Sequence, residues 1–132
     1  MDKFEGSILV VEDEPALRRL AAQTIRMALP HCRVLEASDG IEAARLAEET
    51  YPAVVITDLR MPRMDGFELC RLLKGRYPNG AVTIIAMTGE PTGRNVDEIR
   101  RCGADACLLK PFGMDELIQQ VEAALKAFFG RL

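Results

Sequence analysis

The sequence has a single histidine, and none of its four cysteines forms a Cys-x-x-Cys pair. A zinc site needs several cysteine or histidine ligands at short, regular spacings, so this composition argues against one. The cysteines, at positions 32, 70, 102 and 107, lie in or beside apolar stretches, where cysteine packs as a small hydrophobic residue. We expect them to be reduced thiols, which favours a cytoplasmic location.

An excess of positive charge and a long apolar run are also missing. Seventeen Lys and Arg residues stand against twenty Asp and Glu, which gives a net charge of -3. Because nucleic-acid binding needs a basic surface, we expect no direct binding to nucleic acid. The apolar run at Ile8–Val11 is too short for a signal peptide or a membrane span, so we expect no membrane contact either.

What the chain does contain is an alternation of short apolar runs and helical patterns. The runs are residues 8–11, 34–35, 53–56, 82–87 and 107–109, and most are rich in Val and Ile. Continuous runs of this kind are typical of strands that are buried on both faces of a parallel sheet. The pattern predicts a doubly wound α/β sandwich in one domain, residues 1–132, with a core from about residue 7 to 128.

The segments between the runs show the spacing of helices with one apolar face. The last helix is the clearest, and the first three show weaker stripes. The predicted faces are Leu17, Leu20, Ala21, Thr24 and Ala28; Ile41, Ala44 and Ala47; Phe67, Cys70, Leu73 and Lys74; and Leu117, Ile118, Val121, Ala124, Leu125 and Phe128. A further weak stripe at Val96, Ile99 and Cys102 predicts a helix before the last strand.

Polar side chains gather where the predicted strands end. Glu12 and Asp13 follow the first run and Asp58 follows the third, while Thr88 and Lys110 follow the fourth and fifth. In open α/β folds, ligands bind at this edge of the sheet. Two unit charges about 4 Å apart repel by roughly 4 kcal/mol at an effective dielectric of about 20, so three neighbouring carboxylates either take up a proton or bind a cation.

The residue types at these strand ends favour Mg²⁺ and phosphoryl chemistry. A ligand set of oxygens, without His or Cys, suits a hard divalent ion such as Mg²⁺. A carboxylate beside Mg²⁺ can attack phosphorus and become an acyl phosphate. The hydroxyl of Thr88 and the ammonium of Lys110 are suited to hold the other phosphoryl oxygens.

Three segments carry a resemblance to a known family. They are VVEDEP at residues 10–15, TDLRMPRMDG at 57–66 and LKPF at 109–112, and they resemble the response-regulator receiver domains of two-component systems. The resemblance extends from about Ile8 to Phe128. It implies a flavodoxin-like (βα)5 fold with strand order 2-1-3-4-5.

The resemblance also implies a role for each strand-end residue. Asp58 is the expected phosphoacceptor; Thr88 and Lys110 are the expected phosphoryl contacts; and Glu12, Asp13, Asp58 and the backbone carbonyl of Arg60 are the expected Mg²⁺ ligands. The phosphoryl donor would be a histidine kinase or a histidine phosphotransfer protein. The switched state would act by changed binding to a downstream protein, and the chain would catalyse only its own phosphotransfer and dephosphorylation. The peptide bond before Pro111 is expected to be cis.

One residue departs from the family pattern. The family often has Tyr or Phe three residues before the lysine, and this chain has Cys107 there. The phosphorylation chemistry does not depend on this position. The usual readout, in which an aromatic ring moves inward after the threonine, cannot apply unchanged.

Two other functions are less well supported by the sequence. Phosphatases of the haloacid-dehalogenase type carry an Asp two residues after the nucleophile, where this chain has Arg60. A nucleotide-binding module would show a Gly-rich phosphate loop after the first strand, and the chain has none there.

Two local expectations concern the mouth of the site. Residues 89–94 include two glycines and a proline, which predicts a long, flexible loop after Thr88. Arg60 and Glu90 each lie two residues beyond a strand-end site residue, so they could pair across the pocket and slow hydrolysis of the acyl phosphate.

Overall fold

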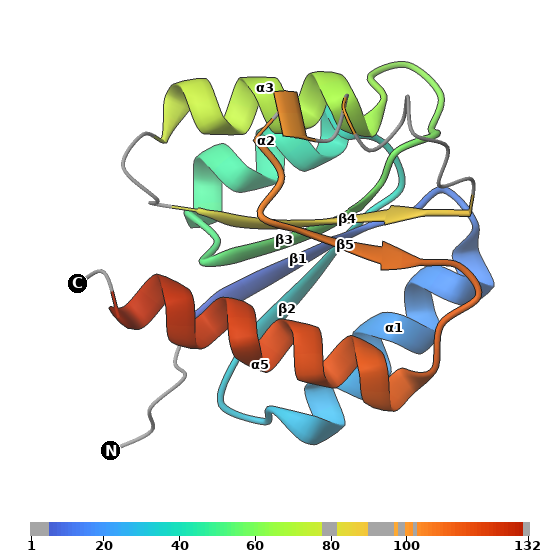
Figure 1. Cartoon of the computed structure of the whole chain (residues 1–132), viewed down its shortest axis with the longest axis vertical. Helices are drawn as coiled ribbons and strands as arrows, with labels where there is room; N and C mark the ends of the chain where they lie inside the picture. The colour runs from blue at the N-terminus through green and yellow to red at the C-terminus, as the bar shows by residue number, and fades with distance from the viewer. Residues whose placement is uncertain (1–5, 78–81, 90–96, 98–99, 102, 131–132) are drawn as a thin grey trace.

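The computed structural model describes residues 6–77, 82–89, 97, 100–101 and 103–130, and Figure 1 shows their arrangement. Its strands are β1 (Ser7–Val11), β2 (Arg33–Ala37), β3 (Val54–Asp58), β4 (Thr83–Thr88) and β5 (Ala106–Leu109). Its helices are α1 (Pro15–Ala28), α2 (Gly40–Thr50), α3 (Gly66–Arg76) and α5 (Met114–Gly130). Val96, Ile99 and Cys102, the three residues that predict a helix before the last strand, lie outside the described residues.

All strands pair in parallel in one sheet, in the order β2-β1-β3-β4-β5. The predicted doubly wound architecture and strand order are therefore confirmed. The carboxyl ends of β1 and β3 come side by side in this order, since Val11 is in register with Thr57, the residue before Asp58. Asp58 in turn is in register with Met87, so Thr88 lies one residue beyond it on β4.

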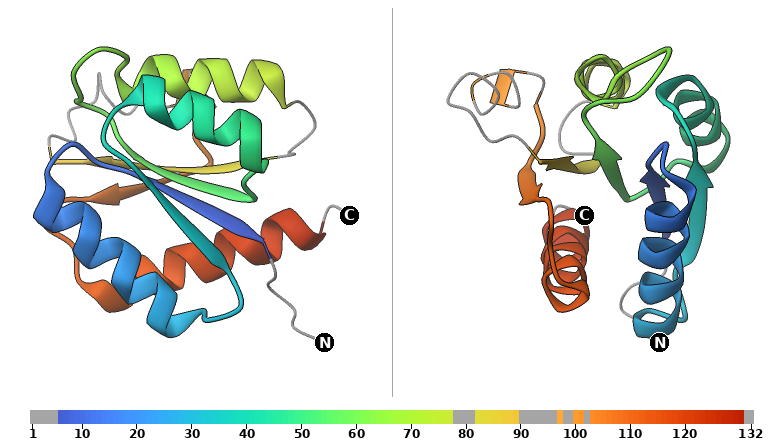
Figure 2. Two further views of the ribbon diagram at one scale, coloured as in Figure 1. Left: turned by 180° about the vertical axis from the view of Figure 1, so that it is seen from behind. Right: turned by 90° about the vertical axis from the view of Figure 1, so that its right-hand side faces the viewer.

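Helices cover both faces of the sheet, with α1 and α5 on one side and α2 and α3 on the other (Figure 2). Along each central strand, successive side chains point alternately into the two cores, one on each face of the sheet. Ile8, Val10 and Ile56 belong to the core under α1 and α5, whereas Leu9 and Val11 belong to the core under α2 and α3. The continuous apolar runs of β1, β3 and β4 are buried on both faces, as predicted.

The predicted apolar face of the first helix is wrong in part. Leu20 is 52% exposed, whereas the helix buries Ala21, Ala22 and Ile25 against the sheet. Small side chains let α1 approach the strands closely, and the larger Leu20 is left outside the contact. In α2, Ile41 is exposed and the buried residues are Gly40, Ala43 and Ala47. The stripes of α3 and α5 are confirmed at their central positions, which include Cys70, Leu73, Leu117, Val121 and Leu125.

The last strand is less buried than its apolar sequence predicts. β5 lies at the edge of the sheet and pairs only with β4 among the described strands. Its Leu108 is buried under α5, while Cys107 and Leu109 are exposed. The expectation that Cys107 packs as a small hydrophobic residue is therefore wrong. Cys32, Cys70 and Cys107 all carry thiols.

No helix within the described residues has the length and apolar character needed to cross a membrane.

Candidate functional site

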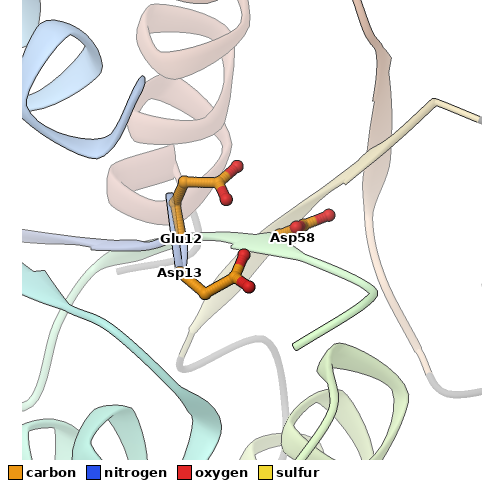
Figure 3. A group of neighbouring side chains, drawn as sticks. All are labelled: Glu12, Asp13 and Asp58. Atoms are coloured by element: carbon orange, nitrogen blue, oxygen red, sulfur yellow. The ribbon is translucent and has the colours of Figure 1, made fainter. Parts of the chain in front are cut away.

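The carboxylates predicted at the strand ends do come together. Glu12 and Asp13 follow β1, Asp58 ends β3, and one oxygen from each lies within 4.8 Å of the others (Figure 3). Glu12 and Asp58 are buried, at 1% and 8% exposure, while Asp13 is open to solvent. The site therefore has two fixed carboxylates inside and one at its mouth.

Lys110 provides the positive charge of the site. It follows β5, and its backbone N–H donates to the carbonyl of Thr88 at 2.8 Å, which ties it to the end of β4. Its Nζ donates to Glu12 Oε1 at 2.6 Å and lies 3.4 Å from Asp58 Oδ2. The bond between Lys110 and Pro111 is cis, as predicted.

Burial and charge act in opposite directions on the two partners of this ion pair. Burial raises the pKa of Glu12, and the hydrogen bond from Lys110 opposes that rise. Burial alone would lower the pKa of Lys110, but the hydrogen bond to Glu12 and the charge of Asp58 outweigh it and raise the pKa. Lys110 is therefore an ammonium ion at neutral pH, held between two carboxylates.

A purely structural explanation of the acidic pair, as caps of the first helix, does not fit. The N-cap of α1 is Glu14, whose side chain accepts hydrogen bonds from the backbone N–H groups of Ala16 and Leu17. Glu12 accepts one from the backbone N–H of Glu14 and directs its other oxygen to Lys110. Asp13 has neither of these capping contacts and points into the carboxylate group.

The two remaining predicted residues border the carboxylates. Thr88 ends β4 and is 4% exposed. Arg60 is exposed and lies after β3, where it helps to line a cleft of about 510 Å³ together with Asp13 and Asp65. Glu90, the predicted partner of Arg60, lies outside the described residues, as does all of the predicted flexible loop at residues 89–94 except Gly89.

A tight junction fixes the chain that leaves Asp58. Gly66, the first residue of α3, donates its backbone N–H to the carbonyl of Leu59 at 3.1 Å. A Cβ atom at Gly66 would lie 2.3 Å from the carbonyl oxygen of Asp58 and 2.7 Å from Cα of Leu59. Only glycine fits here, so the start of α3 packs directly on the backbone of the predicted phosphoacceptor.

The composition of the group suits a divalent metal ion. Three carboxylates beside one ammonium leave the group net negative, and the atoms that the three carboxylates offer to a metal ion are all oxygens. Oxygen-only sites of this kind, with one ligand open to water, are the usual setting for Mg²⁺. Glu12, Asp13 and Asp58 are the side chains that would hold it.

Two contacts near the site were not anticipated from the sequence. Asp39 is the N-cap of α2 and forms an ion pair with Arg63, which lies between β3 and α3. In the sequence, an Asp-Gly pair such as Asp39-Gly40 indicates a chain turn. The Asp-x-x-Glu spacing of Asp39 and Glu42 is a sequence signal for a capped helix start, but nothing local indicates the partner at Arg63.

Comparison with known proteins gives a consistent result. The sequence model of the family described as the response regulator receiver domain matches residues 8–122. The transcriptional regulatory protein KdpE of Mycobacterium tuberculosis is 35% identical over 121 residues, which cover 90% of this chain and 50% of KdpE. The chain thus spans about half the length of this curated relative.

Solved structures agree with the sequence comparison. The chemotaxis response regulator CheY4 of Vibrio cholerae has a TM-score of 0.82 and 28% identity, over 90% of this chain and 98% of that one. A CheY-like receiver domain protein from Methanospirillum hungatei has a TM-score of 0.88 over 96% and 98% of the two chains; at 23% identity it shows the fold alone. The chain belongs to the response regulator receiver domain family.

Proposed function

We propose that this receiver domain is switched by a phosphoryl group that Asp58 accepts from a histidine kinase or a histidine phosphotransfer protein. The observation that carries the proposal is the position of Asp58. Its carboxylate ends a buried central strand, within 4.8 Å of two further carboxylates and 3.4 Å from the ammonium of Lys110. A carboxylate suited to act as the nucleophile, two carboxylates suited to bind a metal ion, and a cation thus lie together at one edge of the sheet.

The chemistry follows from these positions. An oxygen of Asp58 attacks the phosphorus of the donor, and a P–O bond forms while the bond to the donor's imidazole nitrogen breaks. Mg²⁺, when bound, neutralises charge on the phosphoryl oxygens. Lys110 is close enough to Asp58 to donate to the new phosphoryl group. Thr88, at the end of the strand that neighbours β3, would offer its hydroxyl to the same group.

The downstream step is a change in binding to a protein partner. Phosphorylation replaces a carboxylate by a group with more negative charge and more acceptor oxygens, which redirects Lys110 away from Glu12. The usual aromatic readout cannot apply unchanged, because Cys107 occupies the relevant place and is exposed on the edge strand. We further propose a cytoplasmic location, no direct contact with nucleic acid, and no turnover of outside substrates.

Labelling with acetyl phosphate tests the proposal. The protein is incubated with acetyl phosphate in the presence of Mg²⁺ or of EDTA, and intact mass and peptide mapping locate the phosphate. We expect one phosphate per chain, on Asp58, formed only with Mg²⁺ and released by hydroxylamine, as an acyl phosphate is. Continuous release of phosphate in many turnovers, without a labelled chain, would instead indicate a phosphatase.

Mg²⁺ should also stabilise the fold, and this dependence should require Asp13. At about ten times its dissociation constant, Mg²⁺ contributes about 1.4 kcal/mol, or roughly 3–6 °C in Tm. Asp13→Ala should remove most of this rise, because Asp13 is one of the three clustered carboxylates, and should leave the Tm in EDTA unchanged, because its side chain is exposed.

The matched control is Glu116→Ala, which removes an exposed carboxylate in the first turn of α5. Thermal unfolding of wild type and both variants, in EDTA and in millimolar Mg²⁺, measures the effect. A wild-type Tm that is equal in EDTA and in Mg²⁺ would rule out the proposed metal site.

A further inference from the structure

The loop between β3 and α3, residues 59–65, carries the predicted backbone ligand of the metal site. Arg60 lies in this loop, directly after Asp58 and Leu59. The loop is closed at its base by the hydrogen bond from the N–H of Gly66 to the carbonyl of Leu59, at 3.1 Å. This hydrogen bond holds only the two ends of the loop together. The part between them, from Met61 to Asp65, needs another contact to fix its position.

That anchor comes from the start of α2. The N–H of Gly40 donates to the carbonyl of Met64 at 3.2 Å. Next to it, the guanidinium of Arg63 pairs with Asp39, with Nε donating to Oδ2 at 3.0 Å and NH2 donating to the same oxygen. The helices α2 and α3 run side by side on this face of the sheet, and these contacts join their starts (Figure 2).

Asp39 is a fixed anchor. It is 5% exposed, and its other oxygen, Oδ1, accepts from the backbone N–H of Glu42 at 2.9 Å. The hydrogen bond from Glu42 and the charge of Arg63 hold the pKa of Asp39 below its ordinary value. A buried carboxylate that is ionised needs a cation beside it, and Arg63 is that cation.

The backbone at Arg63 indicates that its side chain matters. Its φ is +66°, in the left-handed region that favours glycine or asparagine. A glycine would occupy this position without strain, yet the chain has an arginine whose charged end reaches the buried Asp39. The left-handed backbone at Arg63 is therefore combined with a side chain whose charge is used in an ion pair.

We propose that the Asp39–Arg63 ion pair is a positioning clamp, which holds the β3–α3 loop so that the backbone carbonyl of Arg60 faces the carboxylates of the metal site. Neither residue touches the metal or the phosphoryl group. The pair acts through the loop, and thereby sets the affinity of the site for Mg²⁺. This inference rests on the function proposed above.

A capping role for Asp39 is the simpler alternative, and one substitution separates the two. Asn is as good an N-cap as Asp, so Asp39→Asn keeps the hydrogen bond from Glu42 and loses the charge. Arg63→Gln removes the other half of the pair at a side chain that is 58% exposed, where it is tolerated by the fold. Arg26→Gln is the matched control, because Arg26 forms a half-exposed pair with Glu36 between α1 and β2.

The experiment measures the dissociation constant of Mg²⁺ by calorimetric titration, and the Tm in EDTA, for wild type, the three single variants and the Asp39→Asn/Arg63→Gln double variant. Both single variants in the clamp should weaken Mg²⁺ binding by roughly three- to tenfold, at or below the low end for groups that orient metal ligands. The double variant should be no weaker than the weaker single variant, because the pair acts as a unit. Arg26→Gln should bind as wild type does.

Several outcomes would overturn the clamp. Dissociation constants within about a factor of two of wild type in both single variants would do so. Effects that multiply in the double variant, or an equal loss in Arg26→Gln, would do so as well. If wild type itself binds no Mg²⁺, the proposed function fails and the clamp fails with it; if wild type binds and the variants bind equally well, the clamp alone fails.

Discussion

Replacing Asp58 by Asn should abolish labelling by acetyl phosphate and leave the fold intact. An amide oxygen is a far weaker nucleophile than a carboxylate, so we expect labelling to fall at least about a hundredfold, a barrier change of about 2.7 kcal/mol or more. The substitution keeps the shape of a buried side chain and removes one of three clustered negative charges. The Tm in EDTA should therefore be unchanged or higher, because a source of repulsion is lost.

The control for this experiment is Asp65→Asn. Asp65 lines the cleft beside the site together with Asp13 and Arg60, and it caps α3 by accepting from the backbone N–H of Glu68 at 2.9 Å. Because Asn caps a helix equally well, this variant should keep both its stability and its labelling. Undiminished labelling of Asp58→Asn would place the phosphate elsewhere, and an equal loss in Asp65→Asn would show that the loss is not specific to the side chain of Asp58.

The site carboxylates were predictable because parallel strands present their carboxyl ends at one edge. Glu12, Asp13 and Asp58 needed only correct strand ends to be placed near one another, and the structure brings them within 4.8 Å. Lys110 was placed at the same edge by the same reasoning, and it lies 3.4 Å from Asp58. The roles assigned to these residues rest on the family resemblance and stay predictions until the labelling experiments are done.

The face of α1 shows where sequence periodicity stops being informative. Hydrophobicity favours a stripe through Leu17 and Leu20, but the helix buries Ala21, Ala22 and Ile25. A helix can approach a sheet closely only where its side chains are small. A hydrophobicity pattern does not distinguish small apolar side chains from large ones.

Charged residues of α1 also contribute to its packing. Arg18 and Arg26 pair with Glu36 on β2, and Arg26 also donates to the carbonyl of Val34 on the same strand. A hydrophobicity pattern assigns arginines to the solvent-facing side of a helix, so it cannot identify this contact.

The β3–α3 loop shows a second limit. The contact between Asp39 and Arg63 joins residues 24 positions apart, and each has an ordinary local interpretation, as a turn residue and as a surface charge. Their meeting depends on α2 and α3 lying side by side, which is a property of the folded sheet. Sequence reasoning could identify each residue and could not pair them.

Alanine substitutions at the two glycines of α3, Gly66 and Gly75, should change the stability of the protein in opposite directions. Gly66→Ala would place a Cβ atom 2.3 Å from the carbonyl oxygen of Asp58 and 2.7 Å from Cα of Leu59. Both neighbours are backbone atoms and cannot rotate away, so α3 must shift from the end of β3. We expect a loss of about 3 kcal/mol, at the upper end for overpacking, and a fall in Tm of roughly 10 °C. Labelling should fall as well, because the displaced carbonyl belongs to Asp58 itself.

Gly75→Ala makes the same chemical change near the other end of α3, where a Cβ atom would meet nothing within 4 Å. Alanine is favoured over glycine in a helix interior by up to about 1 kcal/mol, so this variant should be slightly more stable than wild type and should label normally. Thermal unfolding and acetyl phosphate labelling of the two variants, side by side, test the argument. If Gly66→Ala also labels and unfolds as wild type does, the start of α3 has room to move, and the close packing on the Asp58 backbone does not hold the acceptor in place.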